Sequence, residues 1–153
     1  MERKKVLQVA VVGGSDADDE ILALASAVGS VIAGLGAIVV CGGLGGVMEA
    51  VARGAKLQNG ITVGILPSYA HTDTNKYIDI TIPTGLGHAR NVLVVSAGDI
   101  VVGIPGSHGT RAEISIALLL GRPVFGLRAW SDIPGVQPVG SLADLKSKLL
   151  PNF

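Results

Sequence analysis

The feature that most constrains the fold is an alternation between short apolar runs and longer segments with helical spacing. The first run, Val6–Val12, ends at a Gly-Gly pair and has the continuous hydrophobicity of a strand buried on both faces. Apolar residues then recur at helical spacing from Ile21 to Leu35. Repeated strand–helix units of this length form parallel sheets. The sequence therefore predicts a doubly wound α/β fold, mainly parallel, with helices on both faces.

The rest of the chain continues the same alternation. Strands are predicted over 37–41, 61–66, 78–82, 99–104 and 123–127, and helices over 46–58, 86–98 and 108–121. A capping box at Ser141 and Asp144 predicts a short C-terminal helix. Residues 129–140 are expected to be a loop, and the polar loop 67–77 is expected to set ligand specificity. No linker or repeat interrupts the pattern, so residues 1–153 are interpreted as a single domain.

The composition indicates that more than one surface is buried. Hydrophobic residues make up 48% of the chain, charged residues only 16%, and the mean hydropathy is +0.54. The helix predicted over 108–121 is apolar on nearly all sides, so its second face needs a partner. We expect a homo-oligomer, a dimer or tetramer, formed through this helix and the small-residue helix 46–58. The alternative is a helix buried twice within one subunit.

Several classes of function are disfavoured. The formal net charge is zero, so no overall field would recruit nucleic acid or an anionic membrane. Cys41 is the only cysteine, which excludes a disulfide framework and cysteine metal clusters and fits the cytoplasm. The basic N-terminus runs directly into a predicted strand, so we interpret it as the start of that strand rather than as a signal peptide. No uninterrupted apolar stretch is long enough for a membrane span. His71 and Asp73 alone make a poor metal site, so no metal and no required cofactor are expected.

Two glycine-rich turns suit an anion. In parallel sheets ligands lie at the carboxyl ends of strands, where helix N-termini present free N–H groups. The first turn carries four acidic residues between 16 and 20, which favours a capped helix start over a phosphate site. The turns at 42–46 and 105–110 lack this repulsion, and they predict a site for a phosphorylated small molecule. Neither a Walker sequence nor a first-turn GxGxxG occurs, which disfavours Walker-type ATPases and ordinary NAD binding.

Charged residues near these turns have two interpretations each. Arg90 lies near the start of the helix predicted over 86–98, where a cation opposes the helix dipole and an anion would compensate it. It is either a phosphate clamp, with Asn91 adding a polar contact, or one half of a surface salt bridge. Glu113 either completes a capping box with Thr110 or faces the site as an acid or base. The predicted ligand-binding residues are Gly13, Gly42, Gly43, Gly45, Gly46, Arg90, Asn91, Gly106, Ser107, His108, Gly109 and Thr110.

Four stretches of the sequence resemble a known superfamily. They are "CGGLGGVMEAVARGA", "TVGILP", "TGLGHARNVLVVSAGDIVVGIPGSHGTRAEISIAL" and "GRPVFGL". Together they resemble the Rossmann-like superfamily of the Lonely Guy proteins, and they look closest to its short branch of molybdenum cofactor carriers. The resemblance implies a carrier that binds molybdenum cofactor as cargo. Members have often been labelled lysine decarboxylases, but no lysine here has a recognisable cofactor-anchoring context.

The same resemblance implies an alternative activity. Lonely Guy enzymes hydrolyse AMP or cytokinin riboside monophosphates to the base and ribose 5-phosphate, and they carry an Arg and a PGGxGTxxE motif. The resemblance places their catalytic residues on Arg90 and Glu113. This sequence departs from the hydrolase pattern by having Asn91, Ser107, His108 and Ala112 at motif positions. We therefore expect a binding protein for a phosphorylated, nucleotide-like ligand, with hydrolysis of an N-glycosidic bond as the alternative.

Overall fold

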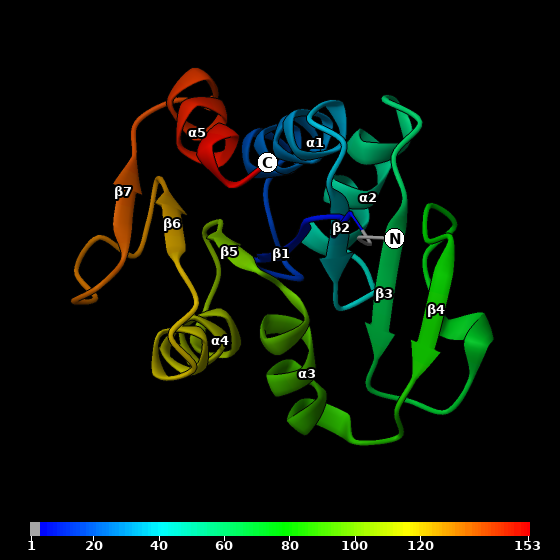
Figure 1. The fold of residues 1–153 in the computed structure, drawn as a ribbon. Helices are drawn as coiled ribbons and strands as arrows, with labels where there is room; N and C mark the ends of the chain where they lie inside the picture. The colour runs from blue at the N-terminus through cyan, green and yellow to red at the C-terminus, as the bar shows by residue number, and fades with distance from the viewer. Residues whose placement is uncertain (1–3) are drawn as a thin grey trace.

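Seven short parallel strands form one sheet in the computed structural model, which describes residues 4–153. The strand order is β4-β3-β2-β1-β5-β6-β7 (Figure 1). In chain order the elements are β1 (Gln8–Val12), α1 (Asp19–Gly34), β2 (Ile38–Cys41), α2 (Val47–Lys56), β3 (Thr62–Leu66), η1 (His71–Asp73), β4 (Ile80–Pro83), η2 (Gly87–Ala89), α3 (Arg90–Ala97), β5 (Ile100–Gly103), α4 (His108–Leu119), β6 (Val124–Leu127), β7 (Gln137–Val139), α5 (Leu142–Leu149) and η3 (Leu150–Asn152). The predicted doubly wound, Rossmann-like α/β fold is confirmed.

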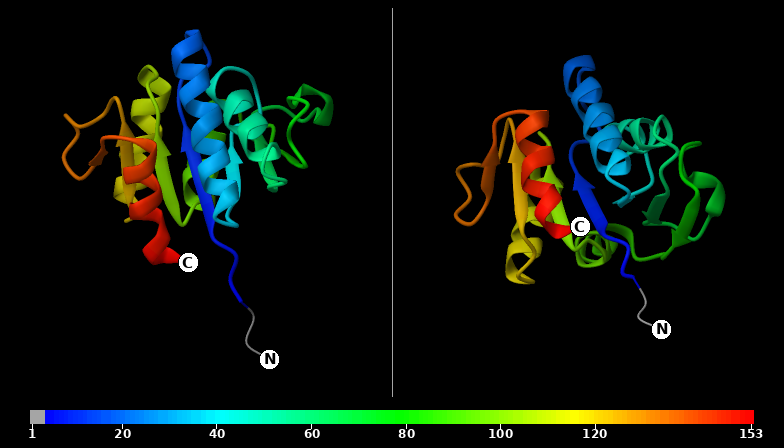
Figure 2. Two further views of the ribbon diagram at one scale, coloured as in Figure 1. Left: turned by 90° about the horizontal axis from the view of Figure 1, so that it is seen from above. Right: turned by 45° about the horizontal axis from the view of Figure 1, so that its top comes forward.

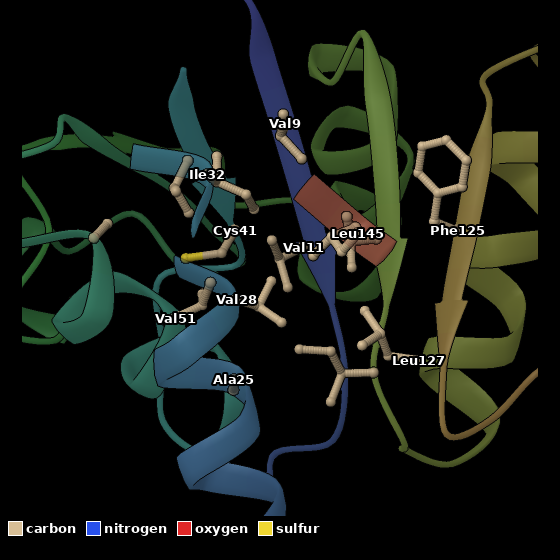
Figure 3. Packing of buried hydrophobic residues seen from close by; sticks show 14 of the residues in the cluster. Val9, Val11, Ala25, Val28, Ile32, Cys41, Val51, Phe125, Leu127 and Leu145 are labelled. Carbon is tan, nitrogen blue, oxygen red and sulfur yellow. The ribbon is translucent and has the colours of Figure 1, made fainter. Parts of the chain in front are cut away.

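Helices cover both faces of the sheet. Figures 1 and 2 show α1, α2 and α5 on one face, with α3 and α4 on the other. Alternate residues of each central strand supply the two cores: Val9 and Val11 of β1 face α1 (Figure 3), while Ala10 and Val12 face α3 and α4. This double burial explains why the strands read as continuous apolar runs rather than alternating ones.

Glycines bring α1 and α2 into backbone contact. A Cβ added at Gly54 would lie 1.7 Å from the carbonyl oxygen of Ser26, and one at Gly29 would lie 2.0 Å from that of Val51. The small residues of the helix predicted over 46–58 therefore pack within the chain, against α1. Its outward residues include the exposed Arg53.

One prediction about secondary structure is wrong. Residues 129–140 were expected to be a loop, but Gln137–Val139 form β7, which pairs in parallel with β6. The strand is three residues long and contains Pro138, which lacks a backbone N–H. An edge position tolerates such a residue because one side of the strand needs no ladder hydrogen bond.

Two helix caps follow the sequence pattern. The Asp18 carboxylate accepts a hydrogen bond from the N–H of Ile21 at 2.9 Å, as expected of an acidic helix start. The Ser141 hydroxyl accepts one from the N–H of Asp144 at 3.1 Å and opens α5, as predicted. Across residues 4–153, no helix combines the length and the hydropathy needed to cross a membrane.

Candidate functional site

Three turns meet at the carboxyl edge of the sheet. Because β1 lies between β2 and β5, the turn after β1 is flanked by the turns after β2 and β5. The N–H of Gly14 donates to the carbonyl oxygen of Pro105 at 3.1 Å, and the carbonyl oxygen of Gly14 accepts from the N–H of Val47 at 3.0 Å. The chain winds away from β1 in both directions, so this crevice is the topological switch point where parallel sheets bind ligands.

A pocket of about 190 Å³ opens between these turns. Its polar and charged lining comes from β1's turn, the turns after β2 and β5, and the starts of α3 and α4. The lining residues are Val11, Val12, Gly13, Gly14, Ser15, Gly42, Leu44, Met48, His88, Arg90, Ser107, Gly109, Thr110 and Glu113. A neighbouring pocket of about 400 Å³ shares Gly14, Ser15 and Ser107 with it, so the two adjoin along the same edge.

Arg90 supplies a buried positive charge to the smaller pocket. It is the first residue of α3 and only 8% exposed, so the interpretation as one half of a surface salt bridge is wrong. Its Nε donates to the carbonyl oxygen of Ile65 at 2.9 Å, and Nη1 donates to Oδ1 of Asn91. Burial lowers the pKa of Arg90 and the negative charge of Glu113 opposes that change. The guanidinium stays protonated and favours an anionic ligand.

Glu113 faces the same pocket from α4. The helix begins at His108 with Ser107 as its N-cap, so Thr110 lies inside the first turn and the capping-box interpretation of Thr110 and Glu113 is wrong. Within residues 4–153 the carboxylate of Glu113 receives no hydrogen bond and forms no ion pair shorter than 4.0 Å. Burial raises its pKa to about 7, although the charge of Arg90 acts to lower it. Glu113 can therefore take up or release a proton near neutral pH.

The predicted ligand residues divide into two groups. Gly13, Gly42, Arg90, Ser107, Gly109 and Thr110 line the pocket, as does Glu113. Gly43, Gly45, Gly46, Asn91, Gly106 and His108 do not line it. Several of this second group shape the turns: Gly43 packs against Gly64, and a Cβ at Gly46 would lie 2.5 Å from the carbonyl oxygen of Ser15.

Seven lining residues lay outside the sequence-based set: Val11, Val12, Gly14, Ser15, Leu44, Met48 and His88. Gly14 and Ser15 belong to the first turn, which was set aside because of its acidic residues. Of the acidic residues in this turn, Asp18 caps α1 and Glu20 pairs with Arg128 at 2.9 Å, while Asp16 and Asp18 line the adjoining pocket of about 400 Å³ rather than the smaller one. Met48 contacts the guanidinium of Arg90, and His88 lies two residues before it. His88 shares the "TGLGHARN" stretch with Arg90, which is the signal that could have identified it.

Two other ionisable residues near the turns, Arg111 and Cys41, do not contribute a charge to the pocket. Arg111 forms an exposed ion pair with Asp132 at 3.2 Å and stacks over Trp130 at 5.1 Å from the ring centroid. Burial raises the pKa of Cys41 to about 11, so its thiol stays protonated. The pocket thus combines one buried cation, one titratable carboxyl group and backbone turns that can approach an anion closely.

Comparisons with known proteins agree with this arrangement. A protein of unknown role from Archaeoglobus fulgidus is 42% identical over 133 residues, which is 87% of each chain. The molybdenum cofactor binding protein of the phototrophic bacterium Rippkaea orientalis matches in structure with a TM-score of 0.90 and 31% identity, over 98% of both chains. The molybdenum cofactor carrier protein of Chlamydomonas reinhardtii matches with a TM-score of 0.87 and 28% identity, over 96% of this chain and 98% of that one.

The sequence model of the SLOG cluster4 family matches residues 6–147, which include every strand, the whole pocket and most of α5. The match and the two structural likenesses agree with the resemblance carried by the glycine-rich turns and the segment around Arg90. The chain belongs to the SLOG cluster4 family, within the superfamily of Lonely Guy and molybdenum cofactor carrier-like proteins.

Proposed function

We propose that this chain binds the molybdenum cofactor as cargo, as a carrier. The observation that carries the proposal is the structural similarity of this chain, over 98% of both chains, to the molybdenum cofactor binding protein of Rippkaea orientalis. The proposed ligand is a pterin that bears a phosphate tail and an oxyanionic metal group. Such a ligand needs a site that accepts negative charge and also has room for a planar ring system.

The pockets support this proposal in charge and size. Arg90 provides a buried cation beside turns rich in glycine, where backbone N–H groups can approach an oxyanion. The smaller pocket, about 190 Å³, suits an anionic group. The adjoining pocket of about 400 Å³ is lined by Asp16 and Asp18 and leaves room for the planar ring system rather than for a second anion. At neutral pH Glu113 is partly protonated, so it only partly cancels the charge of Arg90.

The test is retention of the cofactor by the purified protein. The cofactor is released from a molybdenum enzyme, mixed with the protein, and its dissociation constant is measured by equilibrium binding. We expect Arg90→Gln to weaken binding about tenfold or more, because one charge-assisted hydrogen bond contributes about 1.5–3 kcal/mol. Arg111→Gln is the matched control, since it removes the same charge from an exposed ion pair outside the pocket. A wild-type protein that does not retain the cofactor would contradict the proposal.

A second candidate is a nucleoside 5′-monophosphate phosphoribohydrolase. The observation that favours it is the pair of Arg90 and Glu113, with a Glu113 pKa of about 7. In this reaction Arg90 and the turn amides would hold the phosphate. Glu113 would stabilise the developing oxocarbenium ion or activate the attacking water. Incubation with AMP, followed by assay of adenine and ribose 5-phosphate, tests it. Turnover that disappears in Glu113→Gln would favour the hydrolase over a pure carrier.

We also propose that the protein forms a homo-oligomer through α4, with α3 beside it. Leu119 is 85% exposed and Leu120 is 43% exposed at the end of α4, while Val92 is 42% exposed on α3. The proposed contact is on the face opposite α2, because the small residues of α2 are already packed against α1. Light scattering after size-exclusion chromatography tests the proposal. Leu119→Lys should shift the protein toward the monomer, and an unchanged mass would count against this interface.

A further inference from the structure

The polar loop between β3 and β4 is fastened to the glycine-rich turn after β2. The side-chain Nδ2 of Asn75 donates to the carbonyl oxygen of Leu44 at 2.8 Å and to that of Gly43 at 3.3 Å. The backbone N–H of Asn75 donates to the carbonyl oxygen of Gly43 at 2.9 Å. Its Oδ1 accepts from the N–H of Tyr77 at 3.0 Å, so the whole amide is engaged. Asn75 thus holds two successive carbonyl groups of the turn.

Holding these carbonyl groups fixes the direction of the next two amides. In a trans peptide the N–H points opposite to the carbonyl oxygen of the same unit. The N–H groups of Leu44 and Gly45 therefore point away from the loop that contains Asn75. Among residues 4–153, neither of these N–H groups finds an acceptor in the protein. Leu44 lines the pocket with Arg90, and Gly45 follows it in the same turn just outside the lining, whereas the loop 67–79 contributes nothing to the lining.

We propose that Asn75 is a positioning residue that turns the amides of Leu44 and Gly45 toward an oxyanion of the ligand beside Arg90. The inference rests on the proposed binding of a phosphate-bearing cofactor, and it deepens that proposal. Asn75 does not touch the ligand; it acts through the turn. The polar loop thereby contributes to the binding site by orienting backbone donors, although none of its side chains enters the pocket.

The geometry supplies a discriminating pair of variants. Asn75→Asp keeps the oxygen that accepts from Tyr77, but it places a second oxygen against the two carbonyl oxygens in place of their donor. Asn75→Ala removes the donor without adding charge, and it serves if the aspartate variant does not fold. Ser68→Ala is the control, because it deletes a hydrogen bond to Asp73 of 2.6 Å in the same loop without touching the turn.

Two measurements test the role. The first follows the ¹H–¹⁵N NMR signals of Leu44 and Gly45 during titration with inorganic phosphate, and a purely structural role would leave this response unchanged. The second measures the dissociation constant for the molybdenum cofactor. In the wild type and in Ser68→Ala we expect both signals to shift. In the Asn75 variants we expect the Gly45 shift to vanish, because the Leu44 carbonyl loses its side-chain donor. The Leu44 shift should only shrink, because the backbone N–H of Asn75 and Oγ1 of Thr74 still hold the Gly43 carbonyl. Cofactor binding should weaken about tenfold or more for the amide lost, as for other charge-assisted hydrogen bonds.

The outcomes separate this inference from the function on which it rests. If the Asn75 variants fold, keep the amide shifts and bind the cofactor as tightly as the wild type does, the positioning role is overturned while cofactor binding stands. Phosphate that shifts signals around Arg90 but not those of Leu44 and Gly45 also overturns it. A wild-type protein that binds neither phosphate nor cofactor overturns the proposed function, and the role of Asn75 with it.

Discussion

Replacing Glu113 by glutamine should stabilise the protein at high pH and not at low pH. The substitution keeps the shape of the side chain and removes its charge. In the folded chain the pKa of Glu113 is about 7, because burial disfavours the carboxylate more than Arg90 favours it, against an ordinary value of 4.5. The folded state therefore binds more protons than the unfolded state between about pH 4.5 and pH 7. Across that window wild-type stability falls as pH rises.

The size of the effect follows from this difference in pKa. Ionising Glu113 costs about 3 kcal/mol more in the folded than in the unfolded chain, at 1.36 kcal/mol for each pH unit. Water that enters the half-buried pocket screens the charge, so we expect about 1–2 kcal/mol of added stability for Glu113→Gln at pH 8. The gain should shrink toward zero as the pH approaches 4.5, where Glu113 is neutral in the folded protein.

Urea unfolding followed by circular dichroism, at a series of pH values between 4.5 and 8.5, measures this gain directly. Glu49→Gln is the control, because Glu49 lies on α2 and does not line the pocket. Equal stability of Glu113→Gln and wild type at every pH, or a loss of stability at pH 8, would refute the reasoning. Such a result would mean that the carboxylate is satisfied where the structure shows no donor.

Four further substitutions test packing and hydrogen bonding outside the pocket lining, each by urea unfolding. Gly54→Ala should cost about 3 kcal/mol or more, because its Cβ would meet a backbone carbonyl of α1 at 1.7 Å, whereas Gly34→Ala has open space and should gain up to about 1 kcal/mol. Burial acts to raise the pKa of Asp79, but hydrogen bonds from Lys56 and Thr62 outweigh it and hold that pKa below 3.8. Asp79→Asn should therefore lose at most about 1 kcal/mol at pH 7, and the loss should fade below about pH 3.8. Trp130→Phe should cost about 1–3 kcal/mol, because the indole Nε1 donates at 3.0 Å to a buried backbone carbonyl.

The fold was predictable because its signals are local. Strands β1, β2, β3 and β5 are apolar runs that end at or next to a glycine or proline, and strand–helix repetition leaves few topologies. The short strand β7 gave no such signal, since three residues with a central Pro138 resemble a loop in isolation. Its position becomes apparent only when β6 is in place beside it.

The candidate site was predictable at its turns and less so at its long-range contacts. Arg90 stood out because a cation near a helix start is unfavourable without an anion. Its hydrogen bond to the carbonyl of Ile65 joins residues 25 positions apart, and no sequence pattern marks it. The same holds for Asn75, whose partners lie 31 and 32 positions away. The glycines at 43 and 46 were correctly placed in the turn, but they shape it from outside the pocket lining.

The peptide groups on either side of Gly14 have a consequence for dynamics. One donates to the turn after β5 and the other accepts from the first residue of α2, so a single hydrogen-bonded series links the two halves of the sheet. Opening of one half should loosen the other, and the amide protons of Gly14 and Val47 should exchange with solvent as one cooperative unit. A ligand bound over Gly14 would therefore slow exchange in both halves together, including at Val47, which does not line the pocket.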